Sequence, residues 1–137
     1  MIVVDAGALL EVLLKSASGR TVRSALAQDD AAAPALLDAE VVHRLLVLEK
    51  HRYLDASVVT DRVRRLGAAP VRRLDHRPLL AAARRFGRAL CGYDALYAAA
   101  ADALSATLLT TDLRFAHACA TQFALPVTTV PTTPRQR

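Results

Sequence analysis

The stretch MIVVDAGALLEVLL, residues 1–14, decides the fold because its hydrophobic pattern changes at one acidic residue, Asp5. The residues before Asp5 form a short, continuous apolar run, which predicts a strand at residues 2–5. The residues after it repeat their apolar positions at helical spacing, which predicts a helix at about 8–14. A strand that leads directly into a helix is typical of an α/β unit.

Strands and helices are expected to alternate along the rest of the chain. Further strands are predicted at residues 31–33, 71–74, 107–111 and 127–130. Further helices are predicted at 21–28, 34–51, 55–67, 78–90 and 93–103 and from 112 onward, with a break at 16–19. We expect Pro34 to open one of these helices and Gly67 to close the next. The pattern predicts an α/β fold with a parallel sheet, a single domain at residues 1–130 and a flexible tail at 131–137.

The composition is that of a globular protein. The chain has 137 residues, of which 53% are hydrophobic and 23% are charged. It contains no apolar run long enough for a membrane span and no basic leader, so we expect a soluble cytoplasmic protein. Cys91 and Cys119 have neither CxxC spacing nor the number needed for a disulfide framework.

The charge distribution leaves two interpretations open. The net charge is +5, and 10 of the 16 arginines lie between Arg52 and Arg88. Arginine binds phosphate with two parallel hydrogen bonds and stacks on bases, so a nucleic-acid partner is plausible. Solvated helix faces of an arginine-rich protein would give the same pattern.

Four acidic residues lie next to or within apolar segments, where a charged carboxylate is unusual: Asp5, Glu40, Asp94 and Asp112. Asp5 and Asp112 each follow a predicted strand, Glu40 lies in a largely apolar stretch, and Asp94 opens an alanine-rich run. Ligands of open parallel sheets bind at the carboxyl ends of the strands, so the predicted topology brings these acids together. Carboxylates that meet repel each other unless a cation neutralises them. A site for Mg²⁺ or Mn²⁺ that hydrolyses a phosphodiester is therefore the leading hypothesis.

Each acid also has a simpler interpretation. Asp5, Asp94 and Asp112 stand where they could do no more than cap helices. Glu40 could be solvated at a helix margin, although apolar neighbours suggest that its face turns inward. The hypothesis therefore depends on the combination of the four.

Four segments together resemble the PIN-domain ribonucleases, specifically the VapC toxins of bacterial toxin–antitoxin pairs. They are IVVDAGALL at 2–10, PALLDAEVVHRL at 34–45, YDALYAAAA at 93–101 and TLLTTDLRF at 107–115. Their order and spacing cover residues 2–130, which is nearly the whole chain. Each segment alone is a weak signal, whereas the four together are fairly specific.

The resemblance implies a PIN-like three-layer sandwich with a five-stranded parallel sheet flanked by helices. It implies an endoribonuclease toxin that depends on Mg²⁺, with Mn²⁺ as a substitute, and that uses Asp5, Glu40, Asp94 and Asp112 as metal-binding and catalytic residues. Thr110 matches a position at which the family favours a hydroxyl near the site. The implied partners are RNA and a VapB-like antitoxin whose C-terminal segment covers the active-site groove, and a homodimer is expected.

Two positions qualify this resemblance. The family usually has Ser, Thr or Asn two residues after the first Asp, and Gly7 stands there in this chain. Either a water or the Gly7 backbone replaces the missing hydrogen bond, or the site is weaker. His43 falls at a commonly polar, site-facing position, and a supporting role for it stays open.

Three other interpretations compete with this resemblance. The four histidines, His43, His51, His76 and His117, lack the spacing of a zinc site. A haloacid-dehalogenase-like phosphatase would need a second Asp at the position of Gly7. The serious alternative is a non-catalytic α/β domain that binds RNA or an antitoxin through basic helices while its acids merely cap helices.

Overall fold

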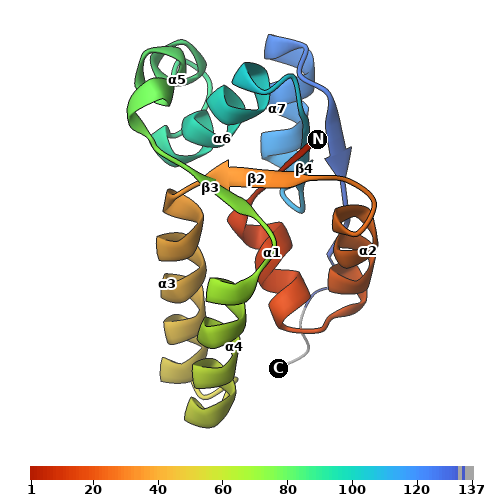
Figure 1. The fold of residues 1–137 in the computed structure, drawn as a ribbon, viewed down its shortest axis with the longest axis vertical. Coiled ribbons are helices and arrows are strands. Elements are labelled where there is room, and N and C mark those ends of the chain that lie inside the picture. Colours follow the sequence, from red (N-terminus) through yellow and green to blue (C-terminus); the bar gives the residue numbers. More distant parts are fainter. Residues whose placement is uncertain (133, 135–137) are drawn as a thin grey trace.

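The sheet has five strands, all parallel, in the order β3-β2-β1-β4-β5 (Figure 1). The computed structural model describes residues 1–132 and Pro134, so most of the tail expected at 131–137 lies outside the described residues. The strands are β1 (Ile2–Val4), β2 (Ala31–Pro34), β3 (Arg72–Leu74), β4 (Thr107–Thr110) and β5 (Val127–Thr129). The predicted fold class and all five predicted strands are confirmed.

Helices cover both faces of the sheet. They are α1 (Ala6–Leu13), α2 (Ala17–Leu26), α3 (Leu36–Lys50), α4 (Ala56–Ala68), the 3₁₀ turn η1 (Arg77–Leu79), α5 (Leu80–Phe86), α6 (Gly92–Ala103) and α7 (Leu113–Phe123). Figure 1 shows α1 to α4 on one side of the sheet and α5 to α7 on the other, which gives the three layers. Among the described residues, no helix combines the length and the apolar character needed to cross a bilayer.

The core is built from small side chains on the central strands and on α6. Val3 and Val4 of β1 and Leu108 of β4 are fully buried. The alanines of α6 at 95 and 98–101 are at most 1% exposed, so this helix lies close to β1, β2 and β4. Because β1 pairs with β2 on one side and β4 on the other, the residue that follows β1 emerges at the middle of the sheet edge. That residue is Asp5.

The expected break at 16–19 is wrong, because α2 already begins at Ala17. The Ser16 hydroxyl oxygen caps the helix by accepting a hydrogen bond of 2.9 Å from the Gly19 amide. Gly19 serves packing here, since a Cβ built on it would lie only 2.0 Å from the Glu11 carbonyl oxygen of α1. The sequence Ser-Ala-Ser-Gly therefore starts a helix and lets it pack tightly against α1.

Pro34 and Gly67 also differ from expectation. Pro34 is the last residue of β2 rather than the start of α3, which begins at Leu36. Gly67 lies inside α4, which continues to Ala68. Ala69 has an extended backbone because it precedes Pro70, and a residue before proline is disfavoured in the helical conformation. Pro70, not Gly67, therefore ends this helix.

Candidate active site

Asp5 is buried at the point where β1 passes into α1. It is 8% exposed and is the N-cap of α1, where its Oδ1 accepts a hydrogen bond of 2.8 Å from the Ala8 amide. Its Oδ2 accepts a hydrogen bond from the Thr110 hydroxyl. Burial raises the pKa of Asp5 to about 6, against the lowering effect of these hydrogen bonds. The carboxylate is thus held rigidly in a place that disfavours its charge.

Asp112 stands at the corresponding place after β4. It is the N-cap of α7, and its Oδ1 accepts hydrogen bonds from the amides of Arg114 at 2.9 Å and Phe115 at 3.1 Å. The Asp112 amide donates to the Thr110 hydroxyl oxygen at 2.9 Å. Thr110 is fully buried and therefore links Asp5 to the backbone of Asp112, so a single hydroxyl fixes the spacing of the two strand-ending acids.

Glu40 and Asp94 reach the same region from helices on opposite faces of the sheet. One Glu40 oxygen, Oε1, is buried without a hydrogen-bond partner, and so is the hydroxyl of Tyr97 on α6. Burial raises the pKa of Glu40 and of Asp94, and the Asp112 charge adds to the effect at Asp94. The pKa of Tyr97 rises through burial and then through the Glu40 charge, so the phenol stays neutral beside the acids. Tyr97 also lowers the pKa of Glu40, which shows that the phenol and the carboxylate lie next to each other, although they do not form a hydrogen bond of good geometry.

All four predicted acids line one pocket of about 140 Å³. The complete lining is Asp5, Ala6, Gly7, Glu40, Arg44, Asp94, Tyr97, Thr111 and Asp112. The structure thus brings together the four residues that the sequence analysis selected, although they come from four different elements. His43 is exposed and lines the neighbouring pocket beyond Arg44 rather than the acidic one.

The sequence analysis missed Arg44, Tyr97 and Thr111. Arg44 lies four residues after Glu40 on α3, and Tyr97 lies three residues after Asp94 on α6. Side chains at these spacings share a helix face, so each acid could have pointed to its neighbour. The position of Thr111 depends on how β4 meets α1, for which the sequence contains no local signal.

The space beside the Cα of Gly7 is already bordered by other side chains. A Cβ built on Gly7 would lie 2.9 Å from the Thr111 Oγ1, 3.2 Å from the Arg44 Nη1 and 3.7 Å from the Asp5 Oδ1. The space in which a larger side chain would stand is therefore bordered by a hydroxyl and a guanidinium from elsewhere in the chain. The Thr111 hydroxyl is a candidate replacement for the hydroxyl that the family usually has at this position.

The pocket residues carry the type of ligand atom, oxygen, that a hard divalent cation prefers. The pocket offers carboxylate oxygens, including the unpartnered Glu40 Oε1, and oxygen ligands are what Mg²⁺ and Mn²⁺ prefer. Its volume has room for an ion and a few waters, since one liquid water occupies about 30 Å³. Across the described residues no three acidic, histidine or cysteine side chains are yet close enough to share one ion, so binding would require them to draw inward.

A larger hollow at the opposite edge of the sheet is a poor candidate for the site. It has a volume of about 760 Å³ and is lined by residues such as Met1, Asp29 and Asp30. The N-terminal amine already pairs there with the Asp29 carboxylate at 2.6 Å. Open parallel sheets bind ligands at the carboxyl ends of their strands, where the acidic pocket lies.

The fold and the pocket define an α/β protein with an acidic site at the carboxyl edge of a parallel sheet. The chain belongs to the PIN domain family, which matches residues 2–120. It is similar to Ribonuclease VapC3 of Mycobacterium tuberculosis strain CDC 1551 / Oshkosh, with 36% identity over 118 residues, 85% of this chain and 86% of that protein. Ribonuclease VapC3 of strain ATCC 25618 / H37Rv has the same identity and coverage.

Proposed function

We propose that this protein is a metal-dependent endoribonuclease, the toxin of a type II toxin–antitoxin pair. One observation carries the proposal: four carboxylates line one small pocket in a PIN domain whose relatives are named Ribonuclease VapC3. A pocket of desolvated acids suits a divalent cation better than it suits any neutral substrate.

Each pocket residue has a proposed part in RNA hydrolysis. Bound Mg²⁺, or Mn²⁺ as a substitute, supplies an acidified water and neutralises charge on the phosphate. Asp5, Asp94 and Asp112 hold the ion, and Thr110 keeps Asp5 in register with Asp112. Glu40, whose pKa is raised by burial and whose carboxylate lies beside Tyr97, would accept a proton from the attacking water.

The proposed partners follow from the same relatives. RNA is the substrate, a VapB-like antitoxin is the inhibitor, and a homodimer is the expected assembly. The basic character of the chain supports an anionic substrate, since its net charge is +5. A supporting role for His43 stays a prediction, and it would have to act from the neighbouring pocket.

A non-catalytic RNA- or antitoxin-binding domain is the second candidate, and one observation favours it. Asp5 and Asp112 do cap α1 and α7 with their side chains, as that reading requires. Glu40 counts against it, because this residue lies inside α3 and caps no helix. Binding without turnover, with no need for metal, is the signature of the second candidate.

The deciding experiment compares RNA ends in cells after induction of the wild-type protein or of Asp5→Asn. New 5′ ends that appear only with the wild-type protein are expected. With purified protein, EDTA should stop cleavage and added Mg²⁺ should restore it. RNA binding without new ends, unaffected by EDTA, would instead establish the non-catalytic domain.

A further inference from the structure

We propose that Arg44, which Gly7 allows to approach the acidic pocket, is the residue that binds the RNA phosphate beside the carboxylates. This inference rests on the proposed function only in taking RNA as the ligand. It assigns the site a phosphate-binding side chain that the four acids cannot provide, because a cluster of negative charges repels a phosphodiester.

Arg44 stands between two pockets. It lines the acidic pocket of about 140 Å³ and also the neighbouring pocket of about 560 Å³, whose walls include Leu10, Glu11 and His43. The larger pocket lies within the size range of small-molecule sites, which is roughly 300–1,000 Å³. A phosphate held at Arg44 would therefore have the carboxylates on one side and space for the adjoining nucleotide on the other.

The guanidinium of Arg44 is available to a ligand. Within the described part of the chain it forms no hydrogen bond or ion pair, unlike Arg73, which pairs with Asp38 at 3.0 Å. Its positive charge does act on the pocket acids, where it lowers the pKa of Asp5, Glu40 and Asp94. Its Nη1 and the Asp5 Oδ1 lie 3.2 and 3.7 Å from the same point, the Cβ position of Gly7, yet the two groups do not pair. An exposed arginine whose donors form no hydrogen bond in the described part of the chain can bind a phosphate through charge-assisted hydrogen bonds.

The geometry of arginine suits this role. Its planar fork can give two parallel hydrogen bonds to phosphate oxygens, which a lysine ammonium cannot match. The Thr111 hydroxyl, 2.9 Å from the same Cβ position at Gly7, lies at the same mouth and offers a further donor.

Gly7 leaves room for this approach. A Cβ at this position would shift the Thr111 hydroxyl and would press on the flexible end of Arg44, since it would lie 2.9 and 3.2 Å from these two side chains.

The test measures RNA binding separately from RNA cleavage. A fluorescein-labelled single-stranded RNA is titrated with the full-length protein in EDTA, with anisotropy as the readout and a gel to confirm that the RNA stays intact. We expect Arg44→Gln to weaken binding about tenfold or more, the usual range for losing a hydrogen bond to a charged group. The slope of log affinity against log salt should fall by about 0.7, the value for one phosphate contact on a single strand.

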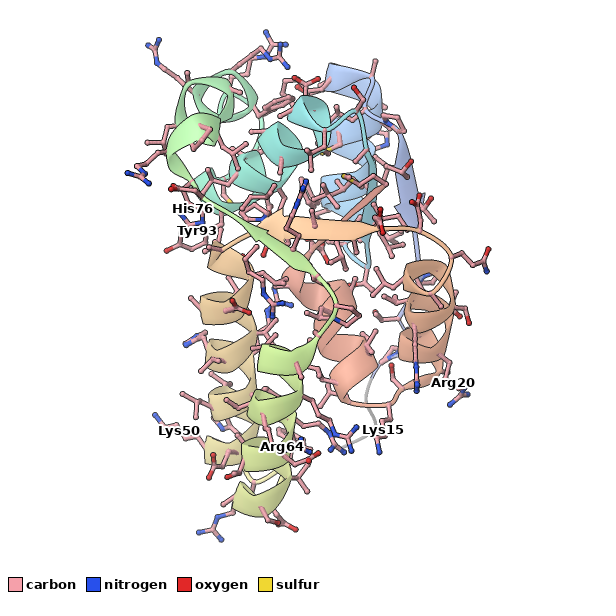
Figure 2. The ribbon with its side chains drawn as sticks, viewed as in Figure 1. Lys15, Arg20, Lys50, Arg64, His76 and Tyr93 are labelled. Atoms are coloured by element: carbon pink, nitrogen blue, oxygen red, sulfur yellow. The ribbon has the colours of Figure 1, made fainter. Side chains whose placement is uncertain are left out.

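Matched variants separate this role from general surface charge. Arg20→Gln removes the same charge from α2, where Figure 2 shows Arg20 pointing outward on the other side of α1 from α3, and should change the affinity less than twofold. Arg44→Lys should recover only part of the affinity. Gly7→Ala should weaken binding as well, although alanine favours the helix, and the Gly7→Ala, Arg44→Gln pair should be less than additive.

The outcomes distinguish this inference from the proposed function. Equal losses for Arg44→Gln and Arg20→Gln, or no RNA binding by the wild-type protein, would overturn the role of Arg44. A tighter affinity for Mg²⁺ in Arg44→Gln with unchanged RNA affinity would also overturn it and make Arg44 a counter-ion of the acids. If the wild-type protein binds RNA through Arg44 but never cleaves it, the proposed nuclease fails while this inference stands.

Discussion

The surroundings of two carboxylates, Asp61 on α4 and Asp5 in the pocket, shift their pKa values in opposite directions. Asp61 is partly exposed and accepts hydrogen bonds from Arg62, from Arg64 at 2.9 Å and from Arg65 at 2.8 Å. These guanidinium groups hold the pKa of Asp61 far below its usual range. Asp5 is buried without an ion pair, and its pKa rises to about 6.

The difference is that the fold neutralises one acid and leaves the charge of the other poorly compensated. Asp61 is neutralised by arginines three and four residues further along the same helix. Among the described residues, Asp5 shares its pocket with three further acids and one arginine, which is the arrangement that a bound cation would stabilise. Perturbed carboxylates gathered in a cleft are typical of functional sites.

The largest expected effect is on cleavage. Asp5→Asn or Asp94→Asn should lower the rate of RNA cleavage at least about a hundredfold, because even residues behind the metal ligands usually contribute 10- to 100-fold. Asp61→Asn is the control and should cleave at the wild-type rate. The rate is measured on a labelled RNA, with circular dichroism to verify the fold. RNA cleavage that persists in a variant with all four acids changed to amides would sink the mechanism.

The second effect is a gain of folding stability in the metal-free Asp5→Asn variant. The pKa of Asp5 rises from 3.8 to about 6 on folding, so the folded state binds the proton more tightly and ionisation costs stability once the pH exceeds 3.8. Above pH 6 the full cost is about 3 kcal/mol, at about 1.4 kcal/mol per pKa unit. Asp5→Asn removes this cost and loses about 1 kcal/mol of hydrogen bonding.

Metal-free Asp5→Asn should therefore be about 2 kcal/mol more stable than the wild-type protein at pH 7.5. The advantage should disappear at pH 4, close to the unfolded pKa of 3.8, because the folded wild-type carboxyl is protonated there and the remaining cost of about 0.5 kcal/mol no longer exceeds the hydrogen bonding that the variant loses. Urea denaturation at both pH values measures the difference. A variant less stable than the wild-type protein at pH 7.5 would show that Asp5 is a structural cap, like Asp112 in the second candidate function.

A third prediction concerns metal. Mg²⁺ at ten times its dissociation constant should stabilise the wild-type protein by about 1.4 kcal/mol, the amount that mass action gives. Asp5→Asn should lose most of this stabilisation, whereas Asp61→Asn should keep it. Thermal unfolding with and without Mg²⁺ provides the readout, and equal shifts in the two variants would place the ion outside the acidic pocket.

The smallest effect concerns α3, which packs against α4 and carries Glu40. The Leu36 amide at the start of α3 donates to the His76 Nε2 at 2.9 Å, and Figure 2 shows His76 beside this end of the helix. No side chain of Ala35 can cap the helix, so His76 does so from a distant segment. His76→Ala should destabilise the protein by about 1 kcal/mol, as loss of a cap usually does. His51→Ala, at the other end of α3, is the control in urea denaturation and should have little effect.

Features that depend on consecutive residues could be predicted from the sequence, whereas features that depend on contacts between distant residues could not. The strands and the acids that end them were predictable, because an apolar run that stops at Asp5 or Asp112 is visible in consecutive residues. The start of α2 was not predictable, because Gly19 allows close packing against the Glu11 backbone of another helix, and this contact is not visible in consecutive residues. Arg44 could have been found, because it lies four residues after Glu40 on the same helix. What the sequence does not show is that its guanidinium comes close to Gly7, which is distant in sequence.

The alanines of α6 have a consequence for how this protein can evolve. A methyl group has no rotamers, so these alanines lose no side-chain entropy on folding. Because their side chains cannot rearrange, the position of α6 on the sheet is fixed. Asp94 stands in the first turn of the same helix and inherits that fixed position. Larger side chains at 95 or 98–101 would overfill the interface and move the acid with the helix. The alanine face should therefore tolerate fewer substitutions than the arginine-rich surface of α4, although it makes no contact with RNA in the proposed reaction.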